Sequence, residues 1–229
     1  MNLERLQNEL ALAVQDQSLE PFFKDWLNDA ILELTGDFDF PALKRLTPVT
    51  LQVTTDNWIY AAPDSFHKKL FRCVNSNDDQ VKVCRKFDEL DYLDINHTAT
   101  EALVTHLVAM ELGMAPLLGI YPMANDTLRL WFYEKPALLE YPDDEPTFMP
   151  VEFHTRVLMP KVIVKNYRLI QDLAAQPPAQ SLLYWENLVR EGLYGSPRGE
   201  VGLVQKMALA TKPKRHGGRD PISSQNWRR

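Results

Sequence analysis

Cysteine and long apolar runs are scarce in this chain of 229 residues. Its two cysteines, Cys73 and Cys84, cannot build a disulfide framework, and so few cysteines are typical of a reducing cytoplasm. No apolar run approaches the ~20 residues that a membrane-spanning helix needs. The first residues show no charged stretch leading into an apolar run, so we expect no secretory signal. The chain therefore reads as a protein made in the cytoplasm, with no membrane partner.

Sequence signatures of catalysis and metal binding are also missing. The five histidines lie far apart, and none is in an HxxxH or HExxH spacing. No glycine-rich phosphate loop, GxSxG elbow or GxGxxG motif occurs. The two cysteines flank a predicted hairpin and could face each other across it, but nothing in the sequence nominates the two further ligands of a metal site. We expect no catalytic site, no cofactor and no metal.

Carboxylates are plentiful in two segments, FDELDYLD at 87–94 and the turn at 143–145. Such clusters can hold a hard cation or supply an acid–base pair. Neither has the alternating ligands and the glycine of an EF-hand loop. We interpret both segments as solvated loops.

Charge is distributed unevenly along the chain, whose formal net charge is −6. From Gly195 onward, eight Lys and Arg stand against Glu200 and Asp220, which gives +6. Residues 1–194 hold the other 17 bases and 29 acids, a net of −12. An acidic body argues against general binding of nucleic acid. The last residues are instead a basic tail that contains glycine, proline, serine and a single Trp227.

The N-terminal region has the periodicity of two helices. Its first apolar residues recur at steps of three and four, the spacing of one helix face. They are Leu3, Leu6, Leu10 and Val14. Ser18 is predicted to cap the second helix and Gly36 to end it. The residues expected on its buried face are Phe22, Phe23, Trp26, Leu27, Ala30, Ile31 and Leu34.

From about Thr47 the apolar period changes to two, which is typical of strands. The segment LTPVTLQVTTDNWIYAAP at 46–63 has β-prone runs on both sides of Asp56-Asn57 and predicts a hairpin. KLFRCVNSNDDQVKVCRKF at 69–87 predicts a second hairpin around a polar turn. Thr127–Glu134 predicts a further strand. Leu103–Met110 fits both a helix and a strand, and we favour the strand.

After the acidic turn EYPDDEP at 140–146, helical periodicity returns. The segment 150–173 predicts a helix that Pro160 kinks or splits, because proline has no backbone donor. The segment 179–195 predicts another helix, and a short apolar run at 201–210 precedes the tail. The residues expected to face inward are Phe153, Val157, Val164 and Tyr167 in the first helix, and Leu182, Trp185, Leu188 and Val189 in the second.

These elements predict an α+β fold. With 45% hydrophobic residues the chain has enough apolar material for a sizeable core. Each terminal helical region is too short and one-sided to bury its apolar stripe alone, so we expect both to form a shared helical bundle. The predicted parts are N-terminal helices at 1–46, an antiparallel β domain at 47–139, C-terminal helices at 140–194 and an extended basic arm at 195–229.

The order of these elements resembles the head–tail adaptor, or connector, proteins of tailed bacteriophages, especially those of short-tailed phages. The motifs that carry the resemblance over residues 1–194 are FFKDWLNDAILEL, WIYAAP, LRLWFYEKPALL, the acidic-proline turn, FHTRVLMPKVIVKNY and LLYWENLVRE. The run LRLWFYEKP, followed by PDDEP and FH, is the most characteristic part. Pro160 departs from the family pattern, which has an uninterrupted helix at this place.

The resemblance implies a structural virion protein at the head–tail junction. It implies a ring of copies, a dodecamer, that joins the portal protein to tail nozzle, tube or fibre proteins. DNA would pass through the lumen without specific binding, and an acidic body would keep it from sticking. Adaptors of this kind are added after the head fills, so the free protein is expected to be mainly monomeric.

We interpret the basic tail as a docking arm, since a flexible arm with an aromatic anchor can become ordered on its partner. Residues expected to dock on the portal or on a neighbouring subunit are Lys212, Lys214, Arg215, Arg219, Trp227, Arg228 and Arg229. A disordered solubilising end is the alternative for this segment. For the whole chain the alternatives are another phage tail or assembly component, a nucleic-acid-binding protein that uses the tail, and an enzyme built on the carboxylates of the β domain.

Overall fold

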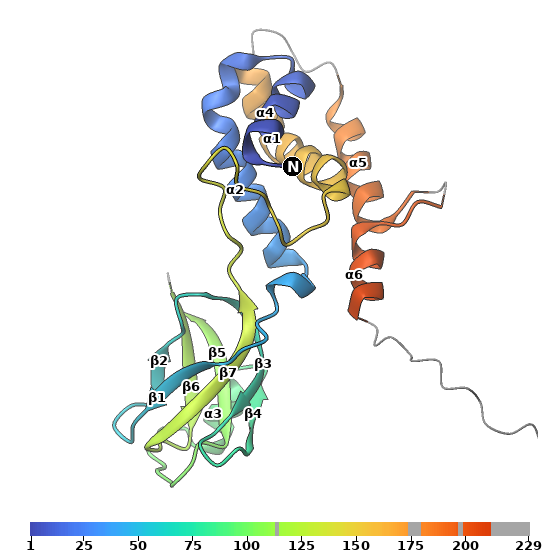
Figure 1. Ribbon diagram of the computed structural model, residues 1–229. Coiled ribbons are helices and arrows are strands. Elements are labelled where there is room, and N and C mark those ends of the chain that lie inside the picture. Colours follow the sequence, from blue (N-terminus) through green and yellow to red (C-terminus); the bar gives the residue numbers. More distant parts are fainter. Residues whose placement is uncertain (113–114, 174–179, 197–198, 212–229) are drawn as a thin grey trace, which may run out of the picture.

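The computed structural model describes residues 1–112, 115–173, 180–196 and 199–211. Helices from both ends of the chain lie together, and the residues between them form a seven-stranded sheet that curls into a nearly closed barrel (Figure 1). The α+β class predicted from the sequence is confirmed. Among the described residues, no helix is both long and apolar enough to cross a membrane.

The helices are α1 (Leu3–Val14), α2 (Glu20–Asp37), α3 (Asp88–Leu93), α4 (Met159–Leu173), α5 (Leu182–Tyr194) and α6 (Leu203–Thr211). A 3-10 turn, Gln17–Leu19, precedes α2, and a π-helical turn, His154–Leu158, precedes α4. We call α1, α2, α4, α5 and α6 the helical body. The strands are β1 (Val49–Val53), β2 (Ile59–Ala61), β3 (Phe66–Val74), β4 (Gln80–Cys84), β5 (His106–Leu112), β6 (Ala115–Tyr121) and β7 (Asp126–Glu134).

The helical body has one apolar cluster, to which helices from both ends of the chain contribute. All four residues of the predicted α1 stripe are buried. On α2 the predicted face is buried except for Phe22, which is 44% exposed, so its assignment to the core was wrong. Phe22 begins a solvent-facing stripe of the helix. Ser18 is not the cap: its N–H donates to Asp16 Oδ1 at 2.8 Å, because the chain enters α2 through the 3-10 turn.

The C-terminal helices follow the predicted pattern with small changes. Pro160 lies in the first turn of α4, directly after the π-helical turn, in which the N–H of Met159 donates to the carbonyl of His154. The helix is not split at Pro160, because helical structure continues without a break from residue 152 to residue 173, and the irregularity at the proline is the π-helical turn. Of the residues expected inside, Phe153, Val157 and Tyr167 are buried, whereas Val164 and those named on α5 are half-buried.

The order of strands in the sheet is β1-β7-β3-β4-β5-β6-β2. The predicted strand at 103–110 is confirmed from His106 onward, and the hairpin of β3 and β4 is confirmed by the pairing of Cys73 with Val81. Two predictions were wrong. β4 and β5 are parallel, so the sheet is mixed rather than antiparallel, and β1 and β2 lie at opposite ends of the strand order instead of forming a hairpin.

Turn chemistry explains the missing β1–β2 hairpin. A two-residue hairpin turn favours a glycine, which Asp56-Asn57 lacks. Instead the hydroxyl of Tyr60 accepts from the N–H of Thr54 at 2.8 Å, and its single hydrogen is shared between the carbonyls of Thr54 and Asn57, each at 3.0 Å. β1 then pairs with β7 and β2 with β6.

The parallel pair explains why the acidic segment FDELDYLD is not the solvated loop predicted. Parallel neighbours need a crossover connection, and α3 lies in it. Leu90 of α3 is fully buried with Val108 and Met110, in a cluster separate from the interior of the barrel. The burial of Leu90 fixes this crossover against β5 and β6.

Candidate functional site at the junction of helices and sheet

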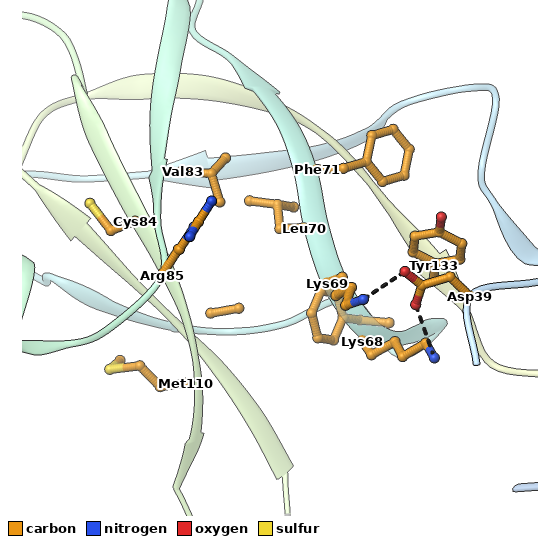
Figure 2. Close-up of a pocket in the computed structure, with 12 residues that line it drawn as sticks. Asp39, Lys68, Lys69, Leu70, Phe71, Val83, Cys84, Arg85, Met110 and Tyr133 are labelled. Carbon is orange, nitrogen blue, oxygen red and sulfur yellow. Dashed lines mark hydrogen bonds and ion pairs between the residues drawn. The ribbon is translucent and has the colours of Figure 1, made fainter. Parts of the chain in front are cut away.

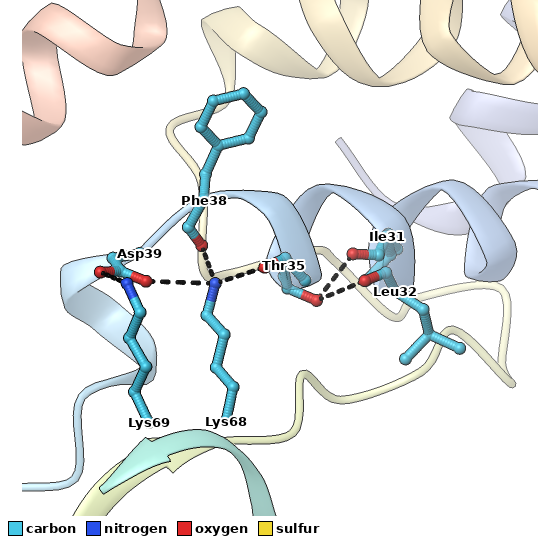
Figure 3. Close-up of polar contacts among 8 residues, drawn as sticks. Ile31, Leu32, Thr35, Phe38, Asp39, Lys68 and Lys69 are labelled. Atoms are coloured by element: carbon cyan, nitrogen blue, oxygen red, sulfur yellow. Dashed lines mark hydrogen bonds and ion pairs between the residues drawn. The ribbon is translucent and has the colours of Figure 1, made fainter. Parts of the chain in front are cut away.

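The sheet is attached to the C-terminal end of α2 by two adjacent lysines of β3 (Figure 3). Lys68 Nζ donates to the carbonyl of Gly36 at 2.9 Å and to that of Phe38 at 2.7 Å, and it lies 3.2 Å from Asp39 Oδ1. The last carbonyls of a helix have no intrahelical partners and carry partial negative charge, which an ammonium group satisfies. Lys69 Nζ binds the other oxygen of Asp39 at 2.6 Å.

A regular strand would not bring two consecutive side chains to one carboxylate, because neighbours point to opposite faces of the sheet. β3 is irregular here: its register against β7 shifts three times between Phe66 and Arg72. Lys69 also has a positive φ of 43°, a conformation that few non-glycine residues adopt. The irregular strand is what places both lysines on Asp39.

Burial and the contacts between the lysines and Asp39 together set the direction of the pKa shifts in this cluster. The side chain of Lys68 is 13% exposed and that of Asp39 is 39% exposed. Burial opposes ionisation of Asp39, but hydrogen bonds from Lys69 and Lys68 outweigh it, so the pKa of the carboxyl lies below its ordinary value. For Lys68 burial is the dominant cause and lowers the pKa of the ammonium group, although Asp39 opposes that shift.

Beside the cluster, β3 and β4 separate and leave a slot in the wall of the barrel (Figure 2). The two strands pair only near their turn, and β4 then continues alongside β5. The slot has a volume of about 680 Å³, with Leu70, Val83 and Met110 on its apolar floor and Lys69 and Arg85 among its polar groups. Such a surface can hold an apolar segment of a partner, and its basic groups can bind an acidic side chain next to that segment.

The helix α6 ends beside this slot. Val204, Met207 and Ala208 line a second hollow of about 410 Å³, together with Asp39 and Lys69 of the cluster. The basic tail follows α6 in the sequence, so it leaves the described chain near the junction of helices and sheet.

The two cysteines do not face each other, contrary to the possibility raised from the sequence. Cys73 pairs with Val81 and lies in the interior of the barrel, whereas Cys84 packs with the cluster around Leu90. Burial, together with the charge of Asp126, raises the pKa of Cys73 to about 12, and burial also raises the pKa of Cys84. Neither thiol is therefore activated as a nucleophile.

The carboxylates of the two acidic segments stabilise the local backbone. Asp94 accepts from the N–H groups of Asn96, Thr98 and Ala99, and Glu89 accepts from Arg85 and Lys86. In the later turn, Asp144 accepts from Glu140 and Tyr141. Within the part of the chain that is described, no group of three metal-ligating side chains comes together.

The site residues named from the sequence all belong to the tail. They are Lys212, Lys214, Arg215, Arg219, Trp227, Arg228 and Arg229, and they lie outside the described residues. Sequence reasoning missed Asp39, Lys68 and Lys69, because adjacent lysines on a strand look like ordinary solvated residues. The local signal was the Asp39 carboxylate, which comes directly after the end of a predicted helix.

Comparison with known proteins adds the family. Comparison with curated proteins finds no significant match. The sequence pattern of the family described as SU10 adaptor protein matches residues 1–197, which include every strand of the sheet and all of the helical body except α6. The chain therefore belongs to the SU10 adaptor protein family and is a head–tail adaptor of the kind found in short-tailed bacteriophages.

Proposed function

We propose that this protein forms a ring that joins the portal to the tail and lines the channel through which DNA leaves the head. The observation that carries the proposal is the family match over residues 1–197. We further propose the units 1–46, 47–139, 140–194 and 195–229 as its functional parts, although the last unit is not extended throughout, because α6 packs on the helical body through buried Leu203. The helices of the first and third units pack in one cluster, and the sheet has its own interior.

The negative charge of the protein body supports the proposal that the ring lines a DNA channel. Residues 1–194 carry a net of −12, so a ring of these bodies would repel the DNA inside it instead of holding it. The partners of such a ring are the portal on one side and nozzle, tube or fibre proteins on the other. Its place is the virion, and its work is assembly without catalysis, as the family implies.

The docking arm is the second element of the proposal. The tail at 212–229 contains six of the chain's Lys and Arg residues together with Trp227. An aromatic side chain buried in a partner is commonly the main anchor of an interface, while basic residues around it bind acidic groups. We propose that this segment binds the portal or an adjacent subunit.

Electron microscopy of the purified full-length protein, with and without its portal, tests the proposal. The protein alone should sediment mainly as a monomer at micromolar concentration, and rings should appear on the portal. A stable ring without portal would contradict addition to filled heads. Failure to bind the portal at all would contradict the adaptor function.

A further inference from the structure

One wall of the barrel carries cations that lie on aromatic rings. Buried and half-buried residues alternate along β7, so Trp131 lies on the outer surface, where the guanidinium of Arg72 is 4.6 Å from its ring centre. The ammonium group of Lys44 lies 4.5 Å from the ring centre of Phe71. Trp131 Nε1 donates to the carbonyl of Leu46 at 3.2 Å, and Leu46 is 86% exposed. We call these five residues the basic wall.

The basic wall has an excess of positive charge. The neighbouring Arg45 and Arg129 each form an ion pair with a carboxylate, so those charges cancel. Lys44 and Arg72 are exposed, and within the described part of the chain neither forms an ion pair with a carboxylate. Four cations against two carboxylates leave a local charge of +2 on a body whose total is strongly negative.

The opposite wall of the barrel is covered by α3. Leu90 packs this helix against β5 and β6, which stand three places away from β7 and β3 in the strand order and therefore on the other side of a nearly closed barrel. Tyr92 is 92% exposed and Ile95 is 77% exposed. Together with Leu46 they are the most exposed large apolar residues of the described chain. We call the following residues the acidic wall: Asp88, Glu89, Asp91, Tyr92, Asp94 and Ile95.

The acidic wall has an excess of negative charge. Lys82 and Lys86 stand at its border with β4, where Lys82 Nζ lies 3.9 Å from a carboxylate oxygen of Glu89. The four carboxylates of the wall against these two lysines leave a local charge of −2. Hydrogen bonds from backbone N–H groups lower the pKa of Glu89 and of Asp94, which keeps both side chains ionised at neutral pH. The two walls thus carry equal and opposite excess charge around exposed apolar groups.

We infer that the acidic wall of one copy binds the basic wall of the next copy, and that this contact, repeated, closes the ring. Two different surfaces on one subunit produce a heterologous contact, which forms rings when the rotation closes. Placing either wall against the same wall of another copy would bring like charges together, which disfavours a two-fold dimer. The inference rests on the proposed ring and names the surfaces that build it.

A nucleic acid is the other partner that a basic wall could bind. Proteins that bind duplex DNA through its backbone commonly make roughly 6–10 phosphate contacts. The basic wall offers two cations that have no carboxylate partner among the described residues. DNA on this wall would also leave Tyr92 and Ile95 exposed on the other side of the barrel. A second copy of the chain covers both walls and is therefore the favoured partner.

Paired cysteine substitutions test the contact in the full-length protein assembled on its portal. With a short bis-maleimide, a chain that carries Leu46→Cys together with Tyr92→Cys or Ile95→Cys should give a ladder of cross-linked oligomers. Each single variant alone should give none. An equal mixture of Leu46→Cys copies and Tyr92→Cys copies should give dimers and nothing larger, because each copy then has one reactive wall. Cys73 and Cys84 are buried and provide the unmodified background.

Two further comparisons make the test specific. Leu12→Cys with Tyr92→Cys is the matched control and should give no ladder, since Leu12 is 73% exposed on α1, outside both walls. Adding Lys44→Glu and Arg72→Glu to the double-cysteine chain should abolish the ladder, because the basic wall then has the same sign of charge as the acidic wall. Lys44→Arg with Arg72→Lys keeps the charge and should preserve the ladder.

The inference is overturned by a ring on the portal without a ladder from the double-cysteine variants, or by a ladder that the two Glu substitutions leave unchanged. Cross-linking of a single variant by itself would show a two-fold contact and would also overturn it. Binding of duplex DNA in a filter assay, if lost with Lys44→Glu and Arg72→Glu, would assign the basic wall to nucleic acid instead. If no copies assemble on the portal, the proposed function fails, so the two failures are distinguishable.

Discussion

The carbonyl oxygen of Arg156 lies against the backbone of Gly192, so close that a Cβ on Gly192 would be 2.2 Å from it. Pro160 stands four residues after Arg156 and has no N–H to donate to that carbonyl. The π-helical turn and Gly192 together let α5 pack on this part of the helical body, with Val157 Cγ2 also at 2.8 Å from the position of the added carbon.

The first prediction follows from this contact. Gly192→Ala should lower the free energy of unfolding by roughly 1–3 kcal/mol, because an added methyl group must displace backbone. Gly36→Ala is the control: an added Cβ meets nothing within 4 Å in the last turn of α2 and should stabilise by about 0.5–1 kcal/mol. Urea unfolding measures the free energy of unfolding of both variants. Equal changes in the two variants would contradict the close approach of Arg156 to Gly192.

The junction lysines should differ in importance. Lys68→Met should cost about 1.5–3 kcal/mol, since it leaves the carbonyls of Gly36 and Phe38 at the end of α2 without their charged donor and removes one of the two ammonium groups beside Asp39. Lys69→Met removes one exposed ion pair and should cost ~1 kcal/mol or less. Denaturant unfolding compares the two variants. A larger loss from Lys69→Met would show that Asp39, rather than the end of α2, is the main partner of this pair.

Acidification should weaken the helical body through His154. The side chain is buried, and burial together with the N-terminal ammonium lowers its pKa below the ordinary 6.5. A histidine with a depressed folded pKa binds protons more readily when unfolded, so stability falls as the pH drops below the unfolded value. Between about pH 7 and pH 5, the midpoint of thermal unfolding should fall more steeply in the wild type than in His154→Gln. If the unfolding midpoints of the two proteins fall in parallel with pH, His154 is not the cause of the acid sensitivity.

Removal of the tail should separate folding from assembly. A chain ending at Ala210 should unfold at the wild-type midpoint but should no longer join filled heads stably. Trp227→Ala should account for most of that loss, at ~2 kcal/mol or more, and Arg229→Ala for ~1 kcal/mol or less. Binding to the portal and the yield of infectious particles measure the effect. A normal yield of infectious particles from the truncated protein would show that the tail is only a solvated end and not a docking arm.

The parts of the structure that could be predicted are those set by neighbouring residues. The buried stripe of α1 follows from residue spacing, and the irregular helical turn next to Pro160 follows from a missing N–H. Strand partners do not follow in this way, because β1 pairs with a strand more than 70 residues later in the chain. The cluster around Asp39 was hidden for the same reason: an irregular β3 and the end of α2 create it together.

The shared core of the helical body has a consequence for synthesis. The ribosome makes α1 and α2 first, but the residues that cover them begin at Leu139, after the whole sheet. At 5–20 residues per second, α2 waits roughly 6–24 s for α4. The sheet, which needs only residues 49–134, can fold during that interval. The nascent chain must therefore hold an unfinished apolar helix pair next to a completed barrel, which makes this interval the stage at which chaperones and crowding would most affect the yield of adaptor.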